Sequence, residues 1–143
     1  MDRVVIDTNV FVSALFKAES APRGVLTLCL SRQITPIMGS ALFWEYREVM
    51  GRDSIQNRFI LSPAERNELL KDYLNLCDWP SINYRWRPNL RDEADNHLID
   101  LAIAGGADWI ITGNKRDFLG GEMMTPQFKV ASPGEFLTER KAS

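Results

Sequence analysis

Short apolar runs alternate with longer amphipathic stretches along this chain, a pattern typical of an α/β domain with a mostly parallel sheet. The apolar runs predict buried strands at residues 4–6, 35–38 and 109–112, and a weaker strand at 128–131. Residues 82–86 alternate apolar and polar side chains, which predicts a strand with one apolar face. The amphipathic stretches predict helices at about 9–16, 23–32, 40–50, 63–77 and 94–104, and a short helix after residue 132.

The ends of several predicted helices carry local signals. Two capping boxes with proline at the first helical position are Ser62-Pro63-Ala64-Glu65 and Ser132-Pro133-Gly134-Glu135. We expect Ser40 to cap the helix that Gly51 ends, and Gly105-Gly106 to stop the helix before the 109–112 strand. The sequence contains no internal repeat or linker. It therefore predicts a single domain over residues 1–143, with a core of about 3–137 and a central sheet of about four to five strands flanked by helices.

Composition and charge narrow the function classes. The chain has 143 residues, of which 45% are hydrophobic and 25% charged, as in an ordinary globular protein. This excludes a disordered or disulfide-rich class. The net charge of -2 argues against a nucleic-acid binder that works by bulk charge, but it leaves room for a nucleic-acid enzyme with a local basic strip.

The remaining bulk features are consistent with a cytoplasmic protein. The apolar runs are far shorter than the roughly 20 residues of a membrane helix, and the opening residues do not have the pattern of a signal peptide. Cys29 and Cys77 lie in apolar stretches, which predicts free core thiols. His97 is the one histidine, so a His-rich zinc site is excluded.

Asp7 directly follows the first predicted strand, where open α/β sheets have their ligand crevice. Thr8 and Asn9 add polar groups at the same point. Asp7 is therefore a candidate site residue, with a helix N-cap as the alternative.

Two further acids fall on or near apolar helix faces. Asp95 lies on the same arc of its helix as Leu98, Ile99 and Ala102, whereas His97 and Asp100 are predicted on the opposite, solvated side. Burying an unpaired carboxylate is costly, so Asp95 is expected to bind a cation, with a first-turn acid favoured by the helix dipole as the alternative. Asp92 fits that capping role better. Glu45 lies at the edge of the apolar arc of its helix, from which it can reach either a crevice or water.

The loop after the 109–112 strand opens on the same predicted crevice. It supplies oxygen ligands from Asn114 and Asp117, although both types also favour ordinary turns. Converging carboxylates without thiolate or imidazole make an oxygen-only site that suits Mg²⁺ or Mn²⁺. The chemistry such a site implies is hydrolytic phosphoryl transfer.

Two segments resemble PIN-domain ribonucleases, and most closely the VapC-related toxin branch of bacterial toxin–antitoxin systems. The first is Val4-Val5-Ile6-Asp7-Thr8-Asn9-Val10-Phe11-Val12-Ser13. The second begins with Asp92-Glu93-Ala94-Asp95-Asn96-His97-Leu98 and continues through Gly105-Gly106 to Ile111-Thr112-Gly113-Asn114. The resemblance runs from residue 4 to about 137.

The resemblance assigns the first three acidic positions of the family to Asp7, Glu45 and Asp95, with Thr8, Asn9 and Thr112 as supporting polar residues. The fourth position departs from many relatives, which carry Asp where this chain has Asn114. Others carry an acid before Phe, as Asp117 stands here, and Asp92 is a further substitute. The resemblance implies Mg²⁺- or Mn²⁺-dependent cleavage of single-stranded RNA, a cognate antitoxin, and a homodimer or higher even oligomer.

Basic residues near the predicted crevice are candidates for RNA contact. Arg85, Arg87 and Arg91 lie among aromatic residues directly before Asp92, a combination that suits phosphate contact and base stacking. The alternative is a strand with its aromatic side chains in the core and its arginines in solvent. Lys115 and Arg116 form a second candidate pair.

Two other functions remain as alternatives. A non-catalytic PIN-like module that binds RNA or protein is compatible with Asn114. A haloacid-dehalogenase-like phosphatase also begins with Asp after its first strand, but it needs a second Asp where this chain has Asn9. A dinucleotide-binding enzyme is disfavoured because no glycine-rich turn follows the first strand.

Overall fold

The computed structural model describes residues 1–81, 93–114 and 128–142, with the backbone alone for residues 93–96 and 142. The predicted strand at 82–86 lies outside the described residues. The elements, in chain order, are β1 (Arg3–Ile6), α1 (Thr8–Ala14), α2 (Ala21–Leu30), β2 (Thr35–Pro36), α3 (Ser40–Met50), the 3-10 helix η1 (Asp53–Arg58), α4 (Pro63–Leu76), α5 (Glu93–Ala104), β3 (Trp109–Ile111), β4 (Lys129–Ala131) and α7 (Pro133–Ala142).

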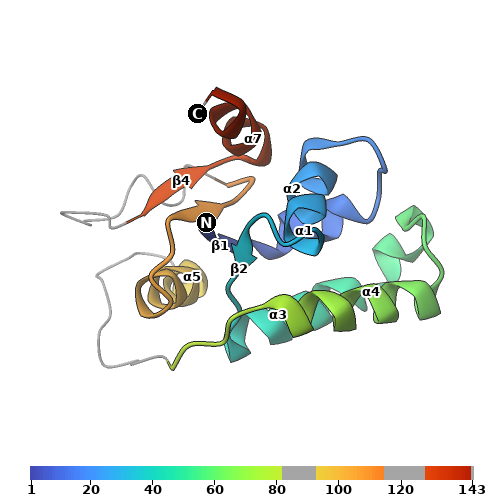
Figure 1. The fold of residues 1–143 in the computed structure, drawn as a ribbon. Helices are drawn as coiled ribbons and strands as arrows, with labels where there is room; N and C mark the ends of the chain where they lie inside the picture. Colours follow the sequence, from blue (N-terminus) through green and yellow to red (C-terminus); the bar gives the residue numbers. More distant parts are fainter. Residues whose placement is uncertain (82–92, 115–127, 143) are drawn as a thin grey trace.

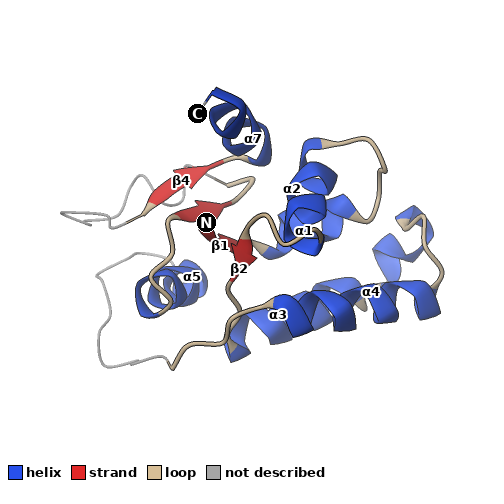
Figure 2. Cartoon of the chain, viewed as in Figure 1, coloured by secondary structure: helices blue, strands red, loops and turns tan. Residues whose placement is uncertain are grey.

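The strands among the described residues form one four-stranded sheet in the order β2-β1-β3-β4 (Figure 2). All three pairings are parallel, with Arg3 opposite Thr35 and Val5 opposite Ile110. The predicted α/β class with a mostly parallel sheet is confirmed. Because β1 and β3 are central neighbours, the residues that follow them emerge side by side at one edge of the sheet.

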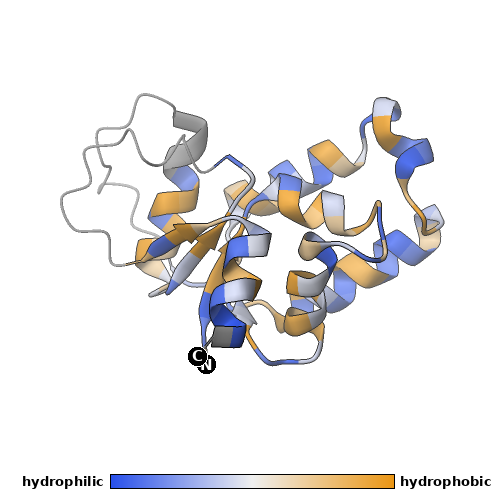
Figure 3. Ribbon diagram, turned by 90° about the horizontal axis from the view of Figure 1, so that it is seen from above, coloured by the Kyte–Doolittle hydropathy of each residue, from blue (hydrophilic) through white to orange (hydrophobic). Residues whose placement is uncertain are grey.

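Helices cover the sheet on both faces (Figure 1). α5 packs against β1 and β3 on one face, whereas α7 packs against β4 and α2 on the other. The two central strands, β1 and β3, are mainly apolar (Figure 3), and the helices contribute buried apolar residues to the same core. No helix within the described ranges is both long enough and apolar enough to cross a membrane.

Local signals placed most helix starts correctly. Both predicted capping boxes form, since the side chain and backbone of Ser62 bond reciprocally with Glu65, and Ser132 does the same with Glu135. Several boundaries were wrong, and three of them have a local explanation. Gly39, not Ser40, is the N-cap of α3. α2 begins two residues early, at Ala21, because the Ser20 hydroxyl accepts from the Arg23 N–H. β2 ends at Pro36, after which Ile37 forms only an isolated bridge.

An aromatic stack joins three helices beneath the end of β1. Tyr46 of α3 stacks on Phe11 of α1 with 4.8 Å between ring centroids, and Phe11 contacts Tyr73 of α4. The Tyr46 hydroxyl donates to the Ile6 carbonyl over 2.6 Å. This bond ties α3 to the last residue of β1.

Both cysteines are free thiols, as predicted, but they differ in burial. Cys29 is fully inside the core, whereas Cys77 is partly exposed. Burial raises the pKa of Cys29 to about 12, which leaves the thiol protonated and unreactive at neutral pH.

The two buried tyrosines provide a matched test of this packing. Tyr46→Phe removes the donor to the Ile6 carbonyl and is expected to lower the free energy of unfolding by about 1–2 kcal/mol. The polar neighbours of the buried Tyr73 hydroxyl are the Tyr46 hydroxyl and the Cys77 thiol rather than a strand carbonyl, so Tyr73→Phe should cost less than Tyr46→Phe. Urea denaturation of both variants measures the difference, and equal losses would contradict the tether.

Candidate active site

Asp7 leaves the end of β1 and is almost completely buried, with 7% of its surface exposed. The Thr112 hydroxyl, directly after β3, donates to Asp7 Oδ2 over 2.7 Å. The backbone N–H of Asp7 donates to the Ile111 carbonyl, which continues the β1–β3 pairing. The predicted convergence of these two strand ends is therefore present.

The capping alternative for Asp7 is confirmed in position but not in its side-chain hydrogen bond. Asp7 occupies the N-cap position of α1, but its carboxylate makes no capping hydrogen bond. Burial raises the pKa of Asp7, the hydrogen bond from Thr112 lowers it, and the nearby charge of Glu45 raises it again, with a net upward shift. The carboxylate is thus held where its negative charge is costly.

Glu45 approaches the same region from α3. The buried Thr8 hydroxyl donates to Glu45 Oε1 over 2.5 Å, and His97 Nε2 lies 3.0 Å from Glu45 Oε2. The hydrogen bond to His97 is the main reason that the pKa of Glu45 lies below its usual value. Thr8 directly follows Asp7 in the chain. The hydrogen bond from Thr8 to Glu45 therefore holds Glu45 close to Asp7.

The placement of His97 and Asp100 in solvent was wrong. The His97 side chain is only 17% exposed, and Asp100 is 4% exposed. The helical pattern assumed one covered face, but α5 packs against β1, β3 and α3, and residues 98–102 are all buried. His97 is the site residue that the sequence reasoning missed. No local pattern identifies it, because its partner lies 52 residues away.

Only some of the remaining predicted site residues lie in the described part of the chain. Asp95 lies on α5, two residues before His97, but its side chain is outside the description. Asn9 and Asn114 are exposed, and the Asn114 backbone N–H donates to the Thr112 hydroxyl over 3.0 Å. The residues that lie outside the described ranges are Arg85, Arg87, Arg91, Asp92, Lys115, Arg116 and Asp117.

The carboxylate oxygens of Asp7 and Glu45 are of the ligand type that a hard cation such as Mg²⁺ prefers. Asp7 and Glu45 are held by hydroxyl and imidazole groups, and no Lys or Arg within the described ranges forms an ion pair with either. Carboxylate oxygens that no Lys or Arg occupies are available to a bound ion. Among the side chains that the structure describes, no group of three or more potential ligands is close enough to hold a metal. The side chains of Asp95 and Asp117 lie outside the described part of the chain.

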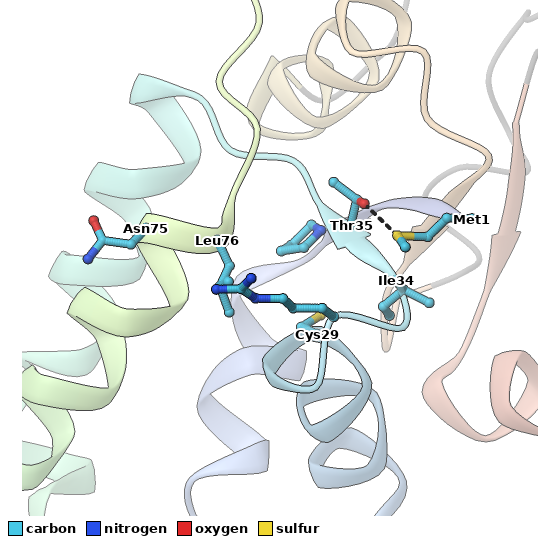
Figure 4. Close-up of a pocket in the computed structure, with 8 residues that line it drawn as sticks. Met1, Cys29, Ile34, Thr35, Asn75 and Leu76 are labelled. Carbon is cyan, nitrogen blue, oxygen red and sulfur yellow. Dashed lines mark hydrogen bonds between the residues drawn. The ribbon is translucent and has the colours of Figure 1, made fainter.

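A hollow of about 440 Å³ lies elsewhere, beside the amino-terminal ends of β1 and β2 (Figure 4). Cys29, Ile34 and Leu76 line it, and across it the Thr35 hydroxyl contacts the Met1 sulfur (Figure 4). Because parallel strands run from this end toward Asp7, the hollow is at the opposite edge of the sheet from the acids. It does not belong to the candidate site.

The buried carboxyl of Asp7 should affect stability even without metal. The pKa of Asp7 is higher in the folded protein than in the unfolded chain, where it is about 3.9. The protonated carboxyl therefore favours the folded state below the unfolded pKa, and this stabilisation is lost as the pH rises through the folded-state pKa. Asp7→Asn keeps an acceptor for Thr112 without the charge. In chelator at pH 7, the variant should therefore have a higher Tm than the native protein, and the difference should shrink in acid. The exposed Asp72→Asn serves as control and should stay within about ±0.5 kcal/mol.

Comparisons with known proteins agree with the fold and the predicted resemblance. The family model described as PIN domain matches residues 3–116. An uncharacterized protein of Methanocaldococcus jannaschii is 28% identical over 149 residues, covering 96% of this chain and 90% of that protein. The fold is similar to that in a crystal structure of VapBC2 from Rickettsia felis bound to a DNA fragment from their promoter. There the TM-score is 0.60 and the identity 17%, over 90% of this chain and 96% of the other.

Proposed function

The chain belongs to the PIN domain family, and we propose that it is a metal-dependent endoribonuclease that cleaves single-stranded RNA as the toxin of a toxin–antitoxin pair. The observation that carries the proposal is the convergence of Asp7 and Glu45 at the carboxyl ends of β1 and β3. Both acids are held there by neutral donors. In open α/β sheets this edge is where ligands bind.

We assign the metal to Asp7, Glu45 and Asp95, with Asp117 or Asn114 as the fourth ligand and Asp92 as a substitute. Bound Mg²⁺ or Mn²⁺ supplies the chemistry of this reaction, by polarising the phosphodiester, activating a water and stabilising the leaving oxygen. The protein contributes by fixing its carboxylates. Thr112 orients Asp7, and Thr8 orients Glu45.

The proposed substrate and partners follow from the same family. Arg85, Arg87 and Arg91 are assigned to the RNA backbone, with Lys115 and Arg116 as a second candidate pair. The similarity in fold to VapBC2 supports a cognate antitoxin. We further propose that the protein acts in the cytoplasm as a homodimer or higher even oligomer.

Loss of the Asp7 charge tests the catalytic assignment. Asp7→Asn should lower RNA cleavage by more than about 100-fold, the upper end for residues that only support a metal ligand. Asp72→Asn is the matched control and should retain activity. The measurement is initial cleavage of a mixed single-stranded RNA pool in Mn²⁺. A native protein that cleaves no RNA at any metal concentration would favour the non-catalytic module instead.

The fourth ligand can be assigned by metal titration. If Asp117 supplies it, Asp117→Asn should raise the Mg²⁺ concentration for half-maximal cleavage, and Asn114→Ala should matter less. If Asn114 is the ligand, the order reverses and Asn114→Asp should tighten binding, because a charged oxygen holds a hard cation better than an amide oxygen. No change in any variant would mean that the other three acids suffice for a single-metal site.

A further inference from the structure

His97 is the one histidine of the chain, and its ring lies against Glu45. The side chain is 17% exposed, and the 3.0 Å separation of Nε2 from Glu45 Oε2 is a hydrogen-bond distance. The ring comes from α5 and the carboxylate from α3, so this contact joins two elements that carry assigned metal ligands. The family resemblance gives His97 no role.

The two ring nitrogens have different surroundings. Nε2 faces an acceptor, whereas Nδ1 is buried and has no hydrogen-bond partner in the described part of the chain. A neutral imidazole carries one N–H. The proton therefore belongs on Nε2, where it donates to Glu45, because on Nδ1 it would be a buried donor without an acceptor.

The contact completes the restraint on Glu45. Thr8 donates to Oε1 and His97 donates to Oε2, so each carboxylate oxygen has its own hydrogen-bond partner. Each oxygen keeps a further lone pair for a cation. A glutamate side chain otherwise has three rotatable bonds to fix when it binds metal, and these two bonds fix its carboxylate in advance.

We infer that His97 is a positioning residue that holds the Glu45 carboxylate ready for the divalent cation and is not itself a metal ligand. The inference rests on the proposed function, since it concerns the same metal. The arrangement agrees with the general use of hydrogen bonds behind ligating carboxylates to set their orientation. If His97 acts in this way, the site needs a hydrogen-bond donor at residue 97, and a side chain other than histidine could supply it.

The tautomer can be read from the native protein without metal or RNA. Because the chain has one histidine, selective ¹⁵N-histidine labelling gives a single ring pattern in a long-range ¹H–¹⁵N spectrum. For the neutral ring we expect the Nε2–H form. A ring protonated on Nδ1 instead would overturn the inference, whatever the protein does with RNA.

Two variants separate the donor from the ring. Gln at position 97 can place an N–H near the position of Nε2, whereas Leu offers no donor at similar volume. His97→Leu should weaken Mn²⁺ binding to the full chain about 10- to 100-fold, and His97→Gln should stay within about threefold of the native protein. Mn²⁺ affinity is measured by titration without RNA, after circular dichroism has shown that both variants are folded. Unchanged affinity in His97→Leu, or equal losses in both variants, would overturn the inference.

Pulsed electron paramagnetic resonance of the Mn²⁺-loaded native protein tests whether His97 is itself a metal ligand, and it needs no variant. With one histidine, any strong ¹⁴N coupling to Mn²⁺ identifies His97 as a ligand, and this result would overturn the positioning role. Absence of that coupling is expected. A native protein that binds no Mn²⁺ would remove the proposed function together with the inference. Normal binding and RNA cleavage in His97→Leu would remove the inference alone.

Discussion

A carboxylate buried at the end of the central strand is the constraint on which the site depends. Asp7 is 7% exposed, and the hydrogen bond from Thr112 compensates only part of the cost of burying its charge. Parallel pairing of β1 with β3 sets this geometry, because it brings the residue after each strand to the same edge. Burial at this edge raises the pKa of the Asp7 carboxyl, and carboxyl groups with a shifted pKa are common at functional sites.

The second acid depends on a separate tether. The Tyr46 hydroxyl binds the Ile6 carbonyl, and this fixes α3 against the end of β1 one residue before Asp7. Glu45 is next to Tyr46 in the chain, so the same bond also holds the backbone of Glu45 near the end of β1. Core packing and site geometry are therefore coupled, since the ring that stacks on Phe11 also positions the helix that carries Glu45.

Most of the fold was predictable because its signals are local. Apolar runs marked the strands of the described sheet, and Ser62 and Ser132 formed the capping boxes that their spacing predicted. The errors fell where competing caps lie close together, as at Ser40, or where a strand is too short to show a period, as at β2. The position of Asp7 at a strand end was likewise readable, since it needs only the strand and the residue that follows it.

The sequence by itself thus determined the α/β class, and it predicted the candidate acids and their chemistry through spacings of a few residues. Tertiary structure decided what each acid touches. The bonds from Thr8 and His97 to Glu45 join residues 37 and 52 positions apart, and no local period encodes such pairs. It also decided the burial of Asp100, because α5 is covered by two strands and a helix, whereas a helical wheel assumes one covered face.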